Sequence, residues 1–445
     1  MKQQRHKFKF IVLLIECMLC GAGYAQQNTG ATNSYKKRVL ETTEVDFLSS
    51  YYSQNGDNAA VTGGIGTEEL TDVTGTIIVS VPLNDDDILT IDAGVSAYTS
   101  ASSSNVDPFD GSERADAFVA STGASRSDVW TNLSGTYTHS SDDRNTMYSG
   151  NLSVSSEYDY FSFGFGGGLT KLFNEKNTEV SINANIFLDT WTPIYPTELR
   201  LFASGANGLD NGFFSNKTIT GNTDYSPTFE KFTDETRNSY SVGLGFSQIL
   251  GKNLQGSLAL DFVKQDGLLS TPFQRVYFAD VADSFIQEFQ LADAIEQLPD
   301  SRFKVAGGGR LNWYINESVV LRSYYRYYFD DWGINSHTAS VEVPIKLTDK
   351  FTVYPSYRFY QQSAADYFYG YEEAFSTDTF YTSDYDLSKY SANQFGMGVS
   401  YTDIFTKMHV WKFGLKSIDV KLYKYDRNTT FSSSIVTAGF KFVMD

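Results

Sequence analysis

The sequence has almost no cysteine and little histidine. Its two cysteines, Cys17 and Cys20, lie near the N-terminus, and four histidines are spread over 445 residues. If the N-terminal segment is cleaved, the mature chain has no thiol, which excludes disulfides, thiol catalysis and iron–sulfur clusters. The histidines that remain, His139, His337 and His409, are too scattered for a zinc or histidine-triad motif. We therefore predict that the chain is not an enzyme and holds no cofactor.

Long apolar runs are also missing beyond the N-terminus. Hydrophobic residues make up only 41% of the chain, and no later stretch has the length and apolarity of a transmembrane helix. The formal net charge of −18 disfavours nucleic acid as a partner. Aromatic residues, by contrast, are abundant, with 30 Tyr and 34 Phe. This abundance is typical of the aromatic girdles of membrane β-barrels.

Residues 1–25 predict a secretory signal peptide. Basic residues precede an apolar stretch from Phe10 to Leu19, and Gly23-Tyr24-Ala25 places small residues at the cleavage positions. A lipoprotein anchored at Cys20 is the alternative, but Met18-Leu19 forms a poor lipobox. We assign 26–44 to a short periplasmic lead-in and 45–445 to a single membrane-embedded domain.

Segment 302–347 shows the strand pattern most clearly. Apolar residues such as Phe303 and Leu311 alternate with charged ones such as Lys304 and Arg310, and the alternation continues into the next two strands. Successive side chains of a strand point to opposite faces, so each strand has one apolar and one polar face. The strands are about a dozen residues long, whereas ordinary strands have about five or six. The pattern predicts an all-β, antiparallel, transmembrane outer-membrane β-barrel.

Similar alternation recurs along nearly the whole chain. It predicts sixteen strands, with fourteen as the alternative count; single-chain bacterial barrels have even numbers. The predicted ranges are 45–53, 72–82, 88–100, 127–140, 146–157, 160–172, 178–191, 236–249, 253–266, 303–315, 318–330, 335–347, 351–363, 391–403, 415–427 and 431–444.

The connections between these strands alternate in length. Short turn sequences such as Gly251-Lys252 and Asn316-Glu317 alternate with connections that include the long segments 54–71, 101–126, 192–235, 267–302 and 364–390. In outer-membrane barrels the short turns are periplasmic and the long loops extracellular, so we expect both termini in the periplasm. The last strand alternates through Phe440 and Phe442, as in segments that the barrel-assembly machinery binds, although it ends in Asp445 rather than an aromatic residue.

Loop 267–302 contains a helical spacing. Val281, Phe285, Phe289, Ala292 and Ile295 recur every three or four residues, and Pro299 follows. This spacing predicts a helix, packed on neighbouring loops or acting as a lid or docking surface.

Charged residues collect on the polar face of four neighbouring strands. Asp261 shares that face. We interpret the set either as a salt-bridged wall that rigidifies the barrel or as a basic lumen stripe that selects anions. Its predicted members are Lys304, Arg310, Arg322, Arg326, Asp330, Glu342, Lys346 and Arg358. Arg322 and Arg326 are expected to pair with acids such as Glu342 and Asp330.

Two loop regions are rich in acids. One contains Asp107, Asp110, Glu113 and Asp116, and the other Asp378, Asp384 and Asp386. Oxygen-rich loops bind divalent cations, but neither run matches a calcium-binding loop. We expect solvated loops, which divalent cations could bridge, rather than a specific calcium site.

The runs 266–278, 298–304 and 321–339 resemble an outer-membrane barrel family known among Bacteroidota, the domain of unknown function 3570 family. The arginine-tyrosine run that ends in Asp330-Asp331-Trp332-Gly333-Ile334 is the most specific part. The resemblance implies an outer-membrane location and no established activity. It also implies partners such as a small lipoprotein or a periplasmic redox protein.

These patterns leave two functions open. The first is a channel or solute-transport barrel in the outer membrane of a Gram-negative bacterium. The second is a non-conducting envelope scaffold that holds partner proteins. Outer-membrane lipids and the assembly machinery are expected partners of either.

Overall fold

The structure of the protein is a computed structural model. It shows a closed antiparallel β-barrel. The structure describes residues 38–444 except 101–126, 200–213, 215 and 229–231. The predicted signal peptide and the acids Asp107, Asp110, Glu113 and Asp116 lie outside the described residues. No helix in the described ranges is long and apolar enough to cross a membrane.

Sixteen long strands form the barrel, and β1 pairs with β23 to close it. They are β1 (Glu44–Gly56), β2 (Leu70–Pro82), β3 (Asp87–Ser100), β4 (Ser127–Ser140), β5 (Thr146–Ser156), β6 (Tyr160–Phe173), β7 (Thr178–Trp191), β9 (Glu235–Gly251), β10 (Leu254–Gly267), β15 (Ser301–Tyr314), β16 (Val320–Asp330), β17 (Asn335–Glu342), β19 (Phe351–Gln362), β20 (Tyr390–Thr402), β22 (Phe413–Arg427) and β23 (Phe431–Met444).

Short elements complete the chain. Two pair with barrel strands, β18 (Ile345–Lys346) and β21 (His409–Val410). Five lie in loops: β8 (Ile219–Gly221), β11 (Arg275–Val276), β12 (Ser284–Ile286), β13 (Phe289–Gln290) and β14 (Ala294–Ile295). Single 3-10 turns are η1 (Ala60–Thr62), η3 (Asn174–Lys176), η4 (Thr197–Leu199) and η7 (Tyr385–Leu387).

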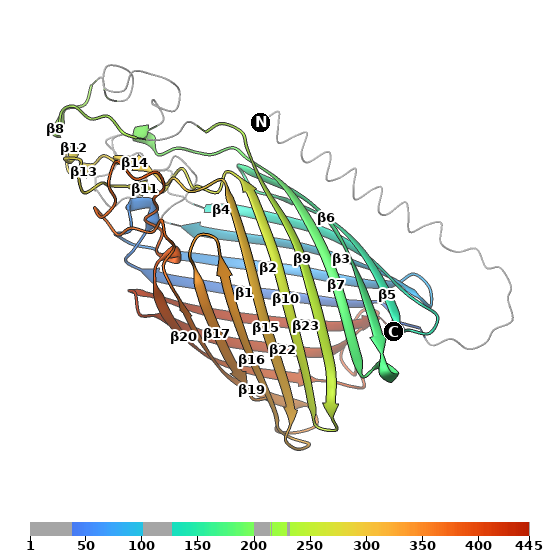
Figure 1. The fold of residues 1–445 in the computed structure, drawn as a ribbon. Coiled ribbons are helices and arrows are strands. Elements are labelled where there is room, and N and C mark those ends of the chain that lie inside the picture. The colour runs from blue at the N-terminus through green and yellow to red at the C-terminus, as the bar shows by residue number, and fades with distance from the viewer. Residues whose placement is uncertain (1–37, 101–126, 200–213, 215, 229–231, 445) are drawn as a thin grey trace.

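The long connections after β1, β7, β10 and β19 lie at one end of the barrel, as expected, and the short turns 157–159, 331–334 and 428–430 lie at that end too. Figure 1 shows β8 and β11 to β14 gathered at one end, here the loop end, while β23 finishes at the opposite, turn end. β17 ends earlier than the predicted 347 because Pro344, which has no N–H for the ladder, interrupts it before β18.

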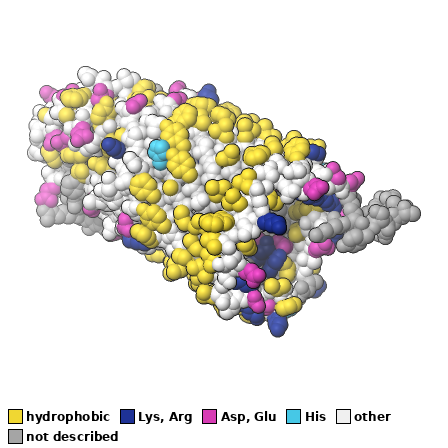
Figure 2. All heavy atoms as spheres, turned by 60° about the horizontal axis from the view of Figure 1, so that its bottom comes forward, with side chains coloured by type: hydrophobic (Ala, Val, Ile, Leu, Met, Phe, Trp, Pro, Cys, Tyr) yellow, Lys and Arg dark blue, Asp and Glu magenta, His cyan; other side chains and the backbone are white. Residues whose placement is uncertain are grey.

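An apolar belt surrounds the outside of the barrel. Large side chains at alternate positions, among them Val73, Leu244, Leu258 and Leu422, are 42–63% exposed. Figure 2 shows hydrophobic side chains over the middle of the visible face, with charged side chains towards the two ends. A band of this kind faces lipid in an outer-membrane barrel, so the all-β transmembrane prediction is confirmed.

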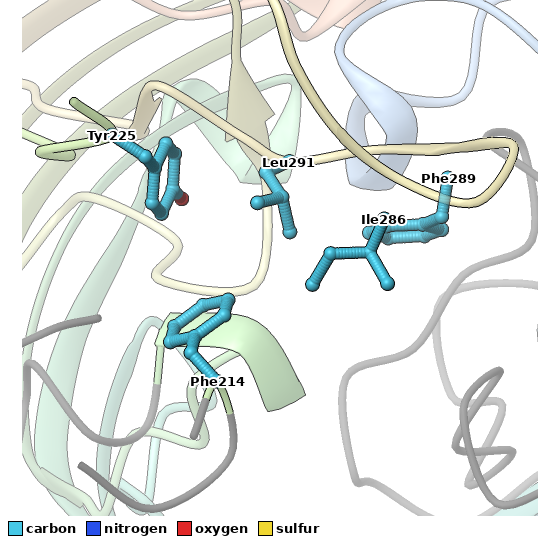
Figure 3. Close-up of a cluster of buried hydrophobic side chains, with 5 residues drawn as sticks. All are labelled: Phe214, Tyr225, Ile286, Phe289 and Leu291. Carbon is cyan, nitrogen blue, oxygen red and sulfur yellow. The ribbon is translucent and has the colours of Figure 1, made fainter. Parts of the chain in front are cut away.

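The clusters of buried hydrophobic side chains lie in the loops rather than in the barrel wall. We call the loops that follow β1, β7, β10 and β19 the cap. Figure 3 shows one of its clusters, in which Leu291 lies among Phe214, Tyr225, Ile286 and Phe289. The Tyr225 hydroxyl donates to the Ala292 carbonyl at 2.6 Å. These contacts fix the loops against one another.

The predicted helix in 267–302 is wrong. The segment holds short strands instead: β11 pairs with β14, and β12 pairs with β13 and with β8 of another loop. Gln287 turns the chain between β12 and β13 with a φ of 58°. The apolar spacing arose because Phe289, Ala292 and Ile295 are buried against other loops, and neighbouring strands satisfy the backbone groups that a helix would have paired internally.

Candidate functional site

Two rows of lumen-facing side chains cross β15, β16, β17, β19 and β20. Backbone register sets both rows, and even-numbered positions of these strands share the face opposite the apolar belt. The row nearer the loop end contains Arg310, Tyr324, Ser340, Arg358 and Gln394. The row nearer the turn end contains Asn312, Arg322, Glu342, Ser356 and Gly396.

Glu342 lies between two cations. Arg322 Nη1 donates to Glu342 Oε1 at 2.8 Å. Lys421 Nζ, from β22, lies 3.7 Å from Glu342 Oε2. Arg322 therefore has the acid partner that the sequence suggested, and this part of the wall is an ion-pair network.

Arg310 and Arg358 differ from Arg322. The Arg310 guanidinium lies over the Tyr324 ring, 5.6 Å from its centroid, and both arginines are exposed to the lumen. Within the described part of the chain, neither forms an ion pair with an acid. Their charge is therefore available to a solute.

The two rows enclose a hollow of about 540 Å³. Arg310, Arg322 and Arg358 line it together with Glu342 and Tyr423. A second hollow of about 330 Å³ adjoins it and shares Arg310 and Tyr324. The second is lined mostly by small residues, namely Ser181, Gly245, Ser247, Ser257, Ala259, Gly308 and Gly309, and it also contacts Glu179. One side of the lumen is thus lined by basic and aromatic residues, and the adjoining side is lined mostly by small residues.

Arg326 and Asp330 do not pair with each other. Arg326 lies over the Tyr328 ring at 6.0 Å, outside both hollows. The side chain of Asp330 is buried and bonds instead to Arg302, whose Nη2 lies 2.5 Å from Asp330 Oδ2. Arg302 was missed by the sequence reasoning, although it has the same parity as Lys304.

Lys304 and Lys346 lie at opposite ends of the wall. Lys304 is opposite Asp330 in the strand register, close to the loop end. Lys346 is exposed at the turn end, where its Nζ lies 2.9 Å from Asp349 Oδ1. Neither lines the two hollows. The predicted set therefore divides into a central group around the hollows and separate contacts at the ends.

The cap crosses the mouth of the lumen. β1 and β10 are the first and ninth of the sixteen strands around the ring, so the loops that follow them start on opposite sides. These loops nevertheless touch, because Arg275 Nη1 donates to the Val61 carbonyl. Phe273 also packs against Ala59 and Val61. Contacts between loops from opposite sides must lie over the lumen.

Arg275 is the central residue of the cap. It is buried, and its Nε donates to Glu198 Oε1 of the loop after β7 at 2.7 Å. Its carbonyl accepts from Ser383 Oγ, in the loop after β19, at 2.9 Å. One side chain and its backbone thereby connect all four cap loops. Sequence patterns gave no sign of this residue, since its partners lie 77 and 214 positions away.

Two buried carboxyl groups of the cap have raised pKa values. Burial, reinforced by the charge of Asp384, raises the pKa of Glu296 to about 8. Burial also raises the pKa of Asp293 to about 7. Glu296 bridges loops, accepting from the Thr271 amide at 2.7 Å and from the Thr382 hydroxyl. Its protonation state therefore affects contacts between the loops after β10 and β19.

The other candidate residues stay dispersed. Asp378 accepts from the Phe375 amide at 2.9 Å, and Asp386 pairs with Arg427 at 2.6 Å. His139 contacts Asp87, and His337 contacts the Tyr325 hydroxyl. Within the described ranges, no three His, Cys, Asp or Glu residues are grouped as a metal site would require.

Comparison with known proteins gives one family and several distant structures. A family model described as protein of unknown function (DUF3570) matches residues 12–430. No curated protein matches the chain in sequence.

Three solved barrels illustrate the distance of the structural matches. A bacterial polysaccharide outer membrane secretin aligns with a TM-score of 0.43 and 10% identity, over 91% of this chain and 98% of that one. A BenF-like porin from Pseudomonas fluorescens Pf-5 aligns with a TM-score of 0.40 and 9% identity, over 91% and 100%. A ferric enterobactin receptor mutant from Pseudomonas aeruginosa aligns with 0.42 and 11%, over 88% and 54%. At these identities, the site has to be interpreted from this chain's own residues.

Proposed function

The chain belongs to the family described as protein of unknown function (DUF3570), and we propose that it is a solute-transport barrel of the Gram-negative outer membrane whose lumen prefers anions. One observation carries this proposal. Arg310 and Arg358 face the hollow in the lumen, and within the described residues neither forms an ion pair with an acid. Rings of basic side chains give pores a preference for anions.

The cap fits a controlled entrance rather than a wide pore. Loops from opposite sides of the barrel meet over the lumen, so a solute has to pass through or beside packed loops. We therefore expect small conductance steps, not the large currents of an open barrel.

Planar bilayers containing the purified protein test this function. We expect discrete current steps. Across a salt gradient, the sign of the reversal potential should indicate selectivity for anions. Arg310→Ala and Arg358→Ala should each shift that potential towards zero because each removes a lumen charge. Lys346→Ala is the matched control, since Lys346 is already paired with Asp349 at the turn end. A protein that inserts but carries no current contradicts the proposal.

An envelope scaffold is the second candidate, and one observation favours it. The connection between β20 and β22 exposes five large apolar side chains at the turn end, with exposed fractions of 57–81%: Ile404, Phe405, Met408, Val410 and Trp411. Such a patch suits a periplasmic partner such as a lipoprotein or redox protein. If Phe405→Ser with Trp411→Ser abolishes the cellular role while bilayer currents stay unchanged, the scaffold is the function that matters.

A further inference from the structure

We infer that the hollow around Arg310 and Arg358 is a discrete binding site for a small organic dianion, either a dicarboxylate or a phosphate monoester. This inference rests on the proposed transport function and adds the class of solute. It differs from a diffuse basic field in placing the ligand between two particular guanidinium groups.

The cations that line the hollow divide into those that an acid neutralises and those that no acid neutralises. Arg322 and Lys421 share the carboxylate of Glu342, at 2.8 and 3.7 Å. Arg310 and Arg358 line the same hollow, and within the described residues no acid pairs with either. A guanidinium that faces a hollow without an acid partner is a binding group for an anion.

Strand register fixes the spacing of these two arginines. Arg310, on β15, and Arg358, on β19, belong to the same row and are separated by Tyr324 and Ser340. Three strand spacings place their Cα atoms about 14 Å apart. Between them, the small side chain of Ser340 leaves space in this row beside the ring of Tyr324. A short molecule fits there with an arginine at each end.

The remaining lining groups suit a polar organic solute. Gln394 and Ser340 supply hydrogen-bond donors, and the rings of Tyr324 and Tyr423 offer flat surfaces for the carbon frame of the solute. A hollow of about 540 Å³ has the size of a small-molecule site. Glu342, already engaged by two cations, is the one carboxylate in its lining. Two unneutralised guanidinium groups match a ligand of charge −2.

Calorimetry on the full-length protein in detergent tests the site independently of conduction. Succinate and glucose 6-phosphate are the probes for the two dianion classes, and acetate and glucose are the monoanionic and neutral controls. We expect saturable binding of at least one dianion, with much weaker binding of acetate and none of glucose. Because each arginine donates charge-assisted hydrogen bonds, Arg310→Gln and Arg358→Gln should each weaken binding about tenfold or more.

Arg326→Gln is the matched control. It removes the same charge from the same wall, but Arg326 lies outside the hollow, so affinity should stay within about twofold of the unaltered protein. Gel electrophoresis of heated and unheated samples verifies that each variant is folded, because the change in mobility on heating should match that of the unaltered protein.

The possible results separate the two proposals. Equal losses in all three variants, or no saturable binding of either dianion, overturn the discrete site. Anion-selective currents without saturable binding leave the transport function standing and remove only this inference. Dianion binding that depends on Arg310 and Arg358, in a protein that carries no current, supports the site and contradicts the channel.

Discussion

At the scale of single residues, Asp330 holds the outer end of the lumen wall together. One of its oxygens accepts from the Trp332 and Ile334 amides at 3.1 and 3.0 Å. The other accepts from the Tyr328 hydroxyl at 2.6 Å and from Arg302. Arg302 in turn lies over the Trp332 ring at 4.3 Å. The same carboxylate therefore shapes the β16–β17 turn and neutralises a cation.

Asp330→Asn should destabilise the barrel strongly. The amide keeps the size of the side chain but leaves Arg302, whose side chain is 13% exposed, without its counter-charge. Loss of one partner of a buried ion pair costs about 3–5 kcal/mol. Guanidinium-induced unfolding in lipid vesicles, followed by tryptophan fluorescence, measures the change. Asp349→Asn, which removes an acid that is 94% exposed, is the control and should leave the stability nearly unchanged.

A result of equal stability for the two variants would show that the Arg302 network does not hold the wall. The sequence predicts that Arg322 and Arg326 pair with acids such as Glu342 and Asp330, and strand parity allows either arginine to be the partner of Asp330. Parity specifies the face of a side chain but not which of several long cations reaches a given acid. That choice depends on turn geometry around Gly333, where φ is 90° and a side chain would collide with Asp366.

At the scale of elements, strands were predictable and loops were not. The predicted range 127–140 coincides with β4, and 178–191 coincides with β7. A barrel strand needs only local alternation between a lipid face and a lumen face, so its signal lies within a dozen residues. The cap loops are held by contacts such as Arg275–Glu198, which link residues 77 positions apart. Local periodicity carries no information on such contacts, and it falsely suggested a helix.

The cap should be more stable in mild acid than at alkaline pH. The pKa of Glu296 is about 8 in the folded cap and near the usual value of 4.5 when the cap opens. A pKa that folding raises means that the folded cap binds the proton more tightly. This contribution is complete below about pH 4.5 and disappears as pH rises through about 8.

Hydrogen exchange of the cap amides at several pH values, corrected for intrinsic exchange, measures this effect. Protection of the loops after β10 and β19 should fall between about pH 5 and 8, while strand amides such as those of β4 stay protected. Glu296→Gln should flatten the dependence because a neutral amide can still bond to Thr271 and Thr382. Asp384 and Asp293 also titrate, so a residual slope is expected. A wild-type profile without slope would mean that Glu296 stays charged in the cap.

At the scale of the whole molecule, three zones follow one another along the barrel axis. The cap is packed and dry, the lumen wall beneath it is charged and polar, and the turn end exposes the apolar patch of 404–411. The outer belt was predictable because it follows strand parity. The division of the arginines into paired and acid-free groups was not, since it depends on which strands become neighbours and on the register between them.

Cysteine labelling of intact cells tests the orientation of these zones. Cys17 and Cys20 are the only cysteines of the chain and fall within the predicted signal peptide, so a single introduced cysteine reports one site. Asp224→Cys and Glu372→Cys, both exposed in the cap, should react with a membrane-impermeant maleimide. Asp143→Cys and Lys252→Cys, both exposed in short turns, should react only after the outer membrane is permeabilised. Gln290 is unsuited as a probe because it is 6% exposed within the cap. Labelling of positions 143 and 252 on intact cells would show that the barrel has the opposite orientation, with the cap on the periplasmic side.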